Sequence, residues 1–224
     1  MQINYATSRL GFEIAQQLLE RLGVSVGSAN PTQSYLQSEI AINSTTANYH
    51  VPILVNDSQN GNQFPTEKRL NLQDVFVPLE LGIFVSVPSS ATAPTLKKYT
   101  YENATAFSTA GAAAALTSLW AGRYSIINDN IQVLPAWDIA RHYMTQRTQQ
   151  AANVGYTASG VNVLDSQDGS TDGFYPIAPS FVLSGANNIQ ASITLPLSIG
   201  TVQTNSRIIV VHRGILLQNV TSVK

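Results

Sequence analysis

The chain has 224 residues, of which 12 are Lys or Arg and 13 are Asp or Glu, so charged residues make up 11% and the formal net charge is -1. An ordinary soluble domain carries about 25% charged residues. Uncharged side chains must therefore supply the polar surface, and the chain contains 17 Asn, 16 Gln, 22 Ser and 19 Thr. The balanced charge argues against a dedicated nucleic-acid binder, and the absence of cysteine excludes disulfides and thiolate metal sites.

The first predicted element is an amphipathic helix over residues 8–23, with Ser8 as its N-cap and Gly23 as its stop. Apolar residues spaced four apart predict one apolar face, made of Leu10, Ile14, Leu18 and Leu22. This face either packs on its own domain or docks as an N-terminal arm on a neighbouring subunit.

Strand patterns follow from residue 35 onward, where apolar and polar residues alternate or form short apolar runs between Asn, Ser and Thr. The predicted strands cover residues 35–42, 49–55, 69–77 and 79–87. Pro78 separates the last two, which we expect to meet at a bend.

The middle of the chain combines helix and hairpin signals. An Ala-rich helix is predicted over residues 108–120, followed by a tight hairpin around residues 128–130 whose second strand ends at Pro135. Residues 137–147 are predicted to form a second amphipathic helix.

The last third is predicted to be strands after a turn-rich loop over residues 165–173. The strands are expected over residues 174–184, 188–195 and 207–218. In the second strand apolar and polar residues alternate, which predicts one buried and one solvent-exposed face. The nearly continuous apolar run in the third predicts burial on both faces.

These signals predict a mainly β fold, an antiparallel two-sheet sandwich of jelly-roll type, although a barrel or an immunoglobulin-like sandwich also accommodates the strands. The domain organisation is a helical arm over residues 1–27 and a single domain over residues 28–224. A helical insertion is expected at about residues 108–150.

Catalytic motifs are missing from the sequence. It contains no nucleophile elbow, phosphate loop or dinucleotide fingerprint, and His50, His142 and His212 lie apart from other metal-ligating residues. We interpret the three as partly buried histidines with satisfied hydrogen bonds. His142 is the strongest candidate for a functional histidine among them, because Asp138 lies four residues before it. The prediction is a protein without enzymatic activity, cofactor or small-molecule substrate.

The turn-rich loop carries three carboxylates within eight residues, Asp165, Asp168 and Asp172. Calcium favours several oxygen ligands from a flexible loop, although the spacing is not that of an EF-hand. The loop is therefore a calcium candidate or, more simply, a solvent-exposed turn, since Asp and Gly are also what turns require.

The composition suits extensive contact with other proteins, because neutral hydrogen-bonding groups avoid the cost of burying ions. Aromatic residues that cluster in the helix and hairpin region are candidate interface anchors: Trp120, Tyr124, Trp137 and Tyr143. The alternative is ordinary core packing of these rings against the sheet.

Three segments carry a resemblance to a known family: residues 69–77 (RLNLQDVFV), 100–107 (TYENATAF, leading into the Ala-rich helix) and 135–142 (PAWDIARH). With the N-terminal helix and strand-rich body, the chain resembles jelly-roll capsid proteins of small tailless icosahedral bacteriophages, including those infecting Bacteroidota. Its length favours a single jelly roll over a double one.

The resemblance implies a virion structural protein that self-associates into a closed icosahedral shell. Its expected partners are other copies of itself and other virion proteins, with Arg141 and Arg147 as possible contacts to a genome or an internal membrane. The start of the sequence lacks signal-peptide features and no apolar run is long enough to span a membrane, which predicts assembly in the host cytoplasm.

Two alternatives remain open. Asn, Gln, Trp and the Asp-rich loop also suit a carbohydrate-binding or adhesin-like β-sandwich module, which predicts a monomer that responds to calcium or glycans. A hydrolase on a jelly-roll scaffold is the third hypothesis, and it requires two carboxylates converging in one cleft.

Overall fold

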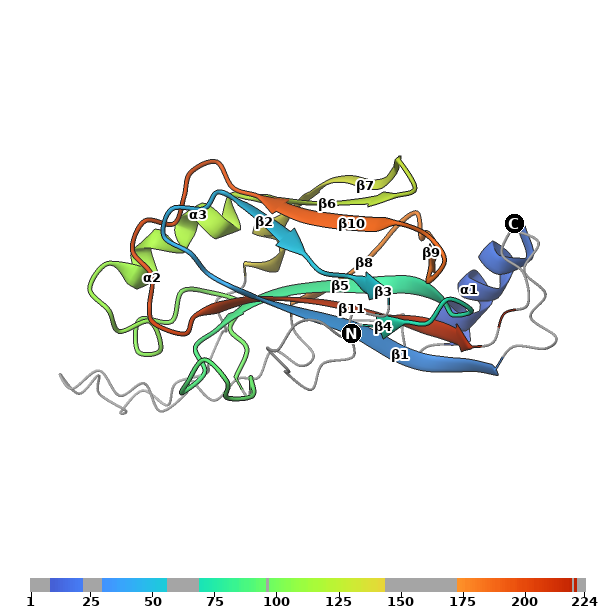
Figure 1. The fold of residues 1–224 in the computed structure, drawn as a ribbon, viewed down its shortest axis with the longest axis horizontal. Coiled ribbons are helices and arrows are strands. Elements are labelled where there is room, and N and C mark those ends of the chain that lie inside the picture. The colour runs from blue at the N-terminus through green and yellow to red at the C-terminus, as the bar shows by residue number, and fades with distance from the viewer. Residues whose placement is uncertain are drawn as a thin grey trace, which may run out of the picture.

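Two antiparallel β-sheets, one above the other, make up most of the structure, with short helices at their margins (Figure 1). The computed structural model describes residues 9–21, 30–55, 69–95, 97–143, 173–218 and 220. The helical elements are α1 (Arg9–Arg21), α2 (Ala112–Ala115), α3 (Thr117–Trp120) and the 3₁₀ helix η2 (Ile139–His142). The strands are β1 (Asn30–Ala41), β2 (Asn48–Val51), β3 (Leu54–Val55), β4 (Arg69–Leu70), β5 (Val75–Ser86), β6 (Arg123–Asn128), β7 (Ile131–Asp138), β8 (Phe174–Pro176), β9 (Leu183–Ser184), β10 (Ile189–Thr194) and β11 (Arg207–Gln218).

The larger sheet has the order β1-β11-β5-β8, with β9 also paired to β5, and the four-stranded sheet has the order β2-β10-β6-β7. All of these pairs are antiparallel, whereas β3 and β4 form a separate short parallel pair. The prediction of a mainly β chain with two antiparallel sheets is therefore confirmed.

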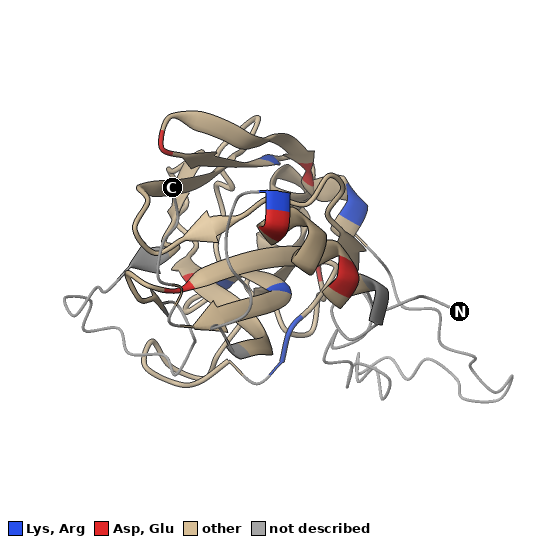
Figure 2. Cartoon of the chain, turned by 90° about the vertical axis from the view of Figure 1, so that its right-hand side faces the viewer, with Lys and Arg blue, Asp and Glu red and all other residues tan. Residues whose placement is uncertain are grey.

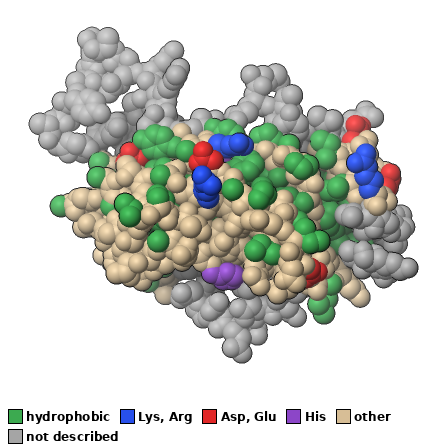
Figure 3. Space-filling model, turned by 90° about the horizontal axis from the view of Figure 1, so that it is seen from above, with side chains coloured by type: hydrophobic (Ala, Val, Ile, Leu, Met, Phe, Trp, Pro, Cys, Tyr) green, Lys and Arg blue, Asp and Glu red, His purple; other side chains and the backbone are tan. Residues whose placement is uncertain are grey.

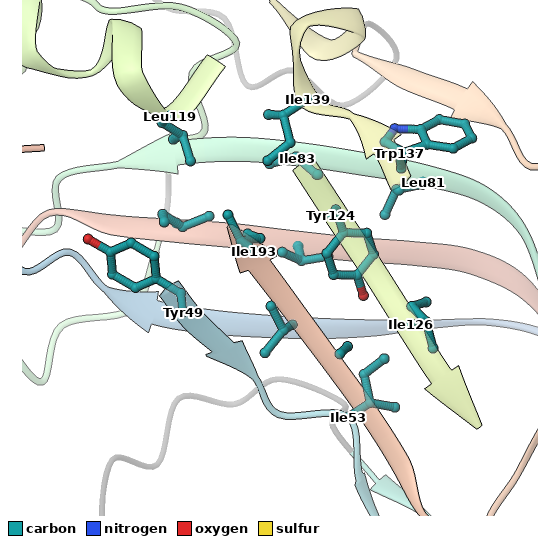
Figure 4. Packing of buried hydrophobic residues seen from close by; sticks show 14 of the residues in the cluster. Tyr49, Ile53, Leu81, Ile83, Leu119, Tyr124, Ile126, Trp137, Ile139 and Ile193 are labelled. Atoms are coloured by element: carbon teal, nitrogen blue, oxygen red, sulfur yellow. The ribbon is translucent and has the colours of Figure 1, made fainter. Parts of the chain in front are cut away.

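The main core fills the space between the two sheets (Figure 4). Tyr124 and Ile193 from the four-stranded sheet point toward Leu81 and Ile83 from the larger sheet, and all four side chains are buried. Leu119 of α3 lies at one end of this layer. Because each strand contributes alternate residues to the layer, the period-2 pattern of the sequence positions the core.

The two most regular strand patterns are confirmed. Along β10, Ile189, Ala191 and Ile193 are buried and alternate with more exposed polar residues. Along β11, one set of side chains enters the main core while the other set, which includes Ile215, lies on the outer face of the larger sheet and is also buried.

The prediction of two strands that bend at Pro78 is wrong, because β5 runs through this position as one strand. The register with β11 shifts there, so that Gly214 lies opposite Pro78 and Arg213 lies opposite Glu80. A β-bulge is one of the few places inside a sheet that tolerates proline. The strand continues because the ladder is already interrupted at the bulge, where proline's missing N–H is tolerated.

Gly214 is expected to be irreplaceable at this bulge. A Cβ atom there would lie 2.0 Å from the backbone oxygen of Val77, which cannot move without breaking the sheet. We expect Gly214→Ala to lower the free energy of unfolding by about 3 kcal/mol or more, as overpacking against backbone does. Urea unfolding measures this, with Thr194→Ala on the exposed side of β10 as the control; equal effects of the two substitutions would contradict the expectation.

The helix predicted over residues 137–147 is also wrong in its described part. β7 extends through Pro135 to Asp138, and only a single 3₁₀ turn, η2, follows it. β7 is the edge strand of its sheet, and Pro135 lies where the register with β6 shifts; both places tolerate a residue without an N–H. The Ala-rich helix is likewise reduced to α2 and α3, after Gly111 with a φ of +82°.

The hairpin between β6 and β7 is confirmed, and Asp129 and Asn130 in its turn adopt positive φ values of 46° and 66°. A two-residue turn of type I′ requires positive φ at both central residues, and Asp and Asn tolerate such values best after Gly. Both strands belong to the four-stranded sheet. The region that the sequence assigns to a helical insertion therefore contributes half of one sheet.

Candidate subunit interface

Helix α1 lies at one end of the sandwich (Figure 1), where it packs on the outer face of the larger sheet. Ala15 and Leu19 are each 1% exposed and form a second apolar core with residues of β5 and β11, including Val77 and Leu217. Ile14 and Leu18 are only half-buried at the margin of this core. The side chain of Leu10 and the whole of Leu22 lie outside the described residues. Among its described side chains, the helix therefore covers its own sheet mainly through Ala15 and Leu19, with Ile14 and Leu18 of the expected stripe packed at the margin.

Leu19 and Phe12 offer a matched test of this arrangement. Leu19→Ala should lower the free energy of unfolding by about 3 kcal/mol, since it removes a fully buried side chain. Phe12 is 39% exposed on the same helix, so Phe12→Ala should cost about 1 kcal/mol or less. Denaturant unfolding of both variants decides whether α1 is part of the folded core; similar small effects would show that it is not.

The four aromatic residues do not form a common surface. Tyr124 is fully buried between the sheets, and Trp120 and Trp137 are only 5% and 7% exposed, because their rings pack against the main core. Core packing therefore replaces the interpretation of these three as exposed anchors. Tyr143 is 40% exposed; its ring lies edge-on to Trp120, and its hydroxyl donates to Glu102 Oε1 at 2.9 Å. This hydrogen bond and partial burial raise the pKa of Tyr143.

His142 lies in a buried hydrogen-bonded chain at the end of β7. The indole N–H of Trp137 donates to His142 Nε2 at 2.8 Å, so Nε2 carries no proton and Nδ1–H donates to the carbonyl oxygen of Gly173, also at 2.8 Å. Burial lowers the pKa of His142 to about 4, against an opposing effect of the Gly173 carbonyl. Asp138 caps η2 through the amide of Ala140 and adds only a weak raising effect on that pKa.

His212 points into the main core from β11. Its Nε2 lies 3.1 Å from the Tyr124 hydroxyl, and burial lowers the pKa of the imidazole to about 3 while raising that of the Tyr124 phenol well above its ordinary value. The interpretation of His142 and His212 as hydrogen-bonded buried histidines is confirmed. His50, in contrast, is exposed on β2.

A buried ion pair that sequence reasoning missed joins β1 to β11. Arg207 Nη1 lies 2.9 Å from Glu39 Oε2, and the two side chains are 5% and 2% exposed. The same guanidinium donates to the carbonyl oxygens of Ala91 at 2.6 Å and Ala93 at 3.2 Å, and Thr95 donates to Glu39 at 2.8 Å. Arg207 thus fixes the loop after β5 against the outer face of the larger sheet. Its partner is 168 positions away, so no local pattern could indicate it.

The outer face of the four-stranded sheet is open, in contrast to the covered faces of the larger sheet. Its exposed or half-exposed side chains are mostly neutral and polar: Asn48, His50, Ser125, Gln190, Ser192 and Thr194. Ser125 and Ser192 are hydrogen-bonded to each other at 3.0 Å across the two central strands. The view from above shows few charged side chains on this surface (Figure 3). Such a surface can pack on another protein without desolvating ions.

Large apolar side chains are exposed at both ends of the sandwich. Leu72, in the loop before β5, is 65% exposed, and Ile131, at the tip of the β6–β7 hairpin, is 68% exposed. Leu197, which is 73% exposed, lies in the loop after β10 beside α3. Figure 2 shows the end that holds α1, where most of the ribbon carries neither acidic nor basic residues.

Asp165, Asp168 and Asp172, the calcium candidates, lie outside the described residues, as does Arg147. Within the described ranges, no group of three or more His, Asp or Glu side chains is placed to share a metal ion. No helix in those ranges is both long and apolar enough to cross a membrane.

No protein-family model matches the chain, and a search of the curated proteins found no matching sequence.

Proposed function

We propose that the two sheets form a single jelly roll and that the chain is a virion structural protein, a capsid subunit whose copies self-associate into an icosahedral shell. The order of the strand pairs is the observation that supports the jelly roll. A jelly roll is an eight-stranded sandwich made of two Greek keys, and capsid proteins are among the proteins built on it.

The strand pairs are nested like those of one long hairpin. β6 pairs with β7, β5 pairs with β8, β2 pairs with β10, and β1 pairs with β11, so each pair encloses the preceding one along the chain. Two further pairings, β5 with β11 and β6 with β10, are those expected when such a hairpin rolls up into two sheets. This supports a jelly roll over an immunoglobulin-like sandwich, which joins its strands in a different order.

The surface supports self-association. A neutral polar face covers the four-stranded sheet, and exposed apolar side chains mark both ends of the sandwich, at Leu72, Ile131 and Leu197. Repeated contacts between identical copies close into a symmetric assembly when the rotation between them closes. With Trp120 and Tyr124 in the core, we place the subunit contacts on these exposed features and on the Phe12 side of α1.

The mass of the purified chain in solution, measured by light scattering behind a sizing column with and without calcium, tests this function. Self-association predicts defined oligomers or shell-sized particles that grow with protein concentration and do not depend on calcium. A monomer at every concentration would contradict self-assembly. A monomer that calcium or glycans stabilise would instead favour the carbohydrate-binding module, with the loop at residues 165–173 as its metal site.

A further inference from the structure

One edge of the larger sheet differs from the other sheet edges of this protein. β1 has twelve residues, about twice the usual length of a strand, and pairs with β11 along all of them. In the described part of the chain, no strand pairs with its second edge. An edge of this kind presents a row of backbone donors and acceptors to any strand that approaches.

The backbone groups that face this edge follow from the ladder. The Ile42 N–H donates to the Ser206 carbonyl at 3.0 Å, and the pairing register continues from there along β1. Antiparallel strands direct the N–H and C=O groups of successive residues to alternate sides. Even-numbered residues of β1 therefore bond to β11, and Gln33, Tyr35 and Gln37 direct their backbone groups to the free edge.

The other edges carry features that discourage pairing. β2 has four residues, and β8 and β9 have three and two. β7 is longer, but it contains Pro135, and the β6–β7 register shifts twice. Short strands, prolines and bulges are the devices by which proteins block edge-to-edge association.

β1 lacks such devices over residues 32–38, which include no charge and no proline. The two residues of β1 that would discourage pairing lie outside this run. Pro31 precedes it, and Glu39 follows it with its charge already paired with Arg207. Gln33 is exposed and Tyr35 is 44% exposed, so the first half of the edge is accessible.

We propose that β1 pairs antiparallel with β1 of a second copy across a two-fold axis, which joins the two larger sheets into one continuous sheet. The inference rests on the proposed self-association and adds a further contact surface to it. A two-fold axis within residues 32–35, in the accessible half of the edge, sets no two like charges opposite each other, so charge repulsion does not oppose the pairing. Such a short strand pair buries less than the roughly 800 Å² per partner of a standard interface, so we expect it to depend on protein concentration.

Two substitutions at Gln33 test the pairing. Gln33→Pro removes an N–H that the ladder with β11 does not use, whereas Gln33→Thr keeps the N–H and favours a strand. The melting temperatures of both monomers should lie within a few degrees of the wild type. By light scattering over a concentration series, Gln33→Thr should associate like the wild type and Gln33→Pro at least tenfold more weakly.

The outcomes separate the two proposals. If Gln33→Pro associates as well as Gln33→Thr, the β1 pairing is refuted while the capsid proposal stands. If the wild type stays monomeric at every concentration, both fall.

Single cysteines provide an independent measurement, because the chain has none of its own. Thr32, Gln33, Ser34 and Tyr35 are each replaced by Cys, with Gln190→Cys on the outer face of β10 as the control. Disulfides need Cβ atoms about 4 Å apart, so only a position beside the two-fold axis can link to itself. Disulfide-linked dimers at one or two neighbouring positions of β1 support the pairing. Equal linking at Gln190, or none on β1, overturns it.

Discussion

Arg207→Ala is expected to lower the free energy of unfolding by about 3–5 kcal/mol, because it leaves the buried Glu39 carboxylate without its charge partner. The carbonyl oxygens of Ala91 and Ala93 lose their donor in the same step, so the loop after β5 should also loosen. Urea unfolding at pH 7 measures the loss of stability, and hydrogen exchange of the loop amides measures the loosening.

Two control variants locate the cause. Arg207→Lys keeps the charge but not the planar fork of donors, so it should recover only part of the lost stability. Arg123→Ala removes an exposed arginine at the start of β6 and should change stability by no more than about 0.5 kcal/mol. A loss at Arg207→Ala no larger than that at Arg123→Ala would show that the buried pair does not hold the loop.

Stability should fall steeply as the pH drops below 6.5, because His142 and His212 remain neutral in the folded chain. Their folded-state pKa values of about 4 and about 3 lie below the ordinary value of 6.5. Between these values the unfolded chain binds protons that the folded chain does not, so each pH unit costs up to about 1.4 kcal/mol per histidine. Above pH 6.5 both rings are neutral in both states, and the effect disappears.

The pH effect is measured as the difference in unfolding free energy between pH 7 and pH 5. The variant that carries both His142→Gln and His212→Gln should lose about 4 kcal/mol less than the wild type over this interval. Gln at position 142 can still accept from Trp137 and donate to Gly173. His50→Gln, at an exposed position, should keep the wild-type slope. An unchanged slope in the double variant would mean that other groups control the acid response.

The candidate interface was less predictable from sequence than the fold. Trp120, Tyr124 and Trp137 have the composition of interface anchors, yet they fill the core, because aromatic rings serve both purposes and only burial distinguishes them. The free edge of β1 and the pairing of Glu39 with Arg207 depend on strand order, which the strand pattern of either segment leaves open.

The sequence by itself determined the local features: the alternation of β10, the doubly buried run of β11, and the β6–β7 turn at Asp129 and Asn130. Each depends on residues a few positions apart, through side-chain alternation or turn geometry. Tertiary structure alone decided that β5 passes through Pro78 opposite Gly214 and that β6 and β7 complete a sheet with β2 and β10. The physical reason is that strand register is fixed by partners far along the chain, whose backbones must meet before the ladder between them exists.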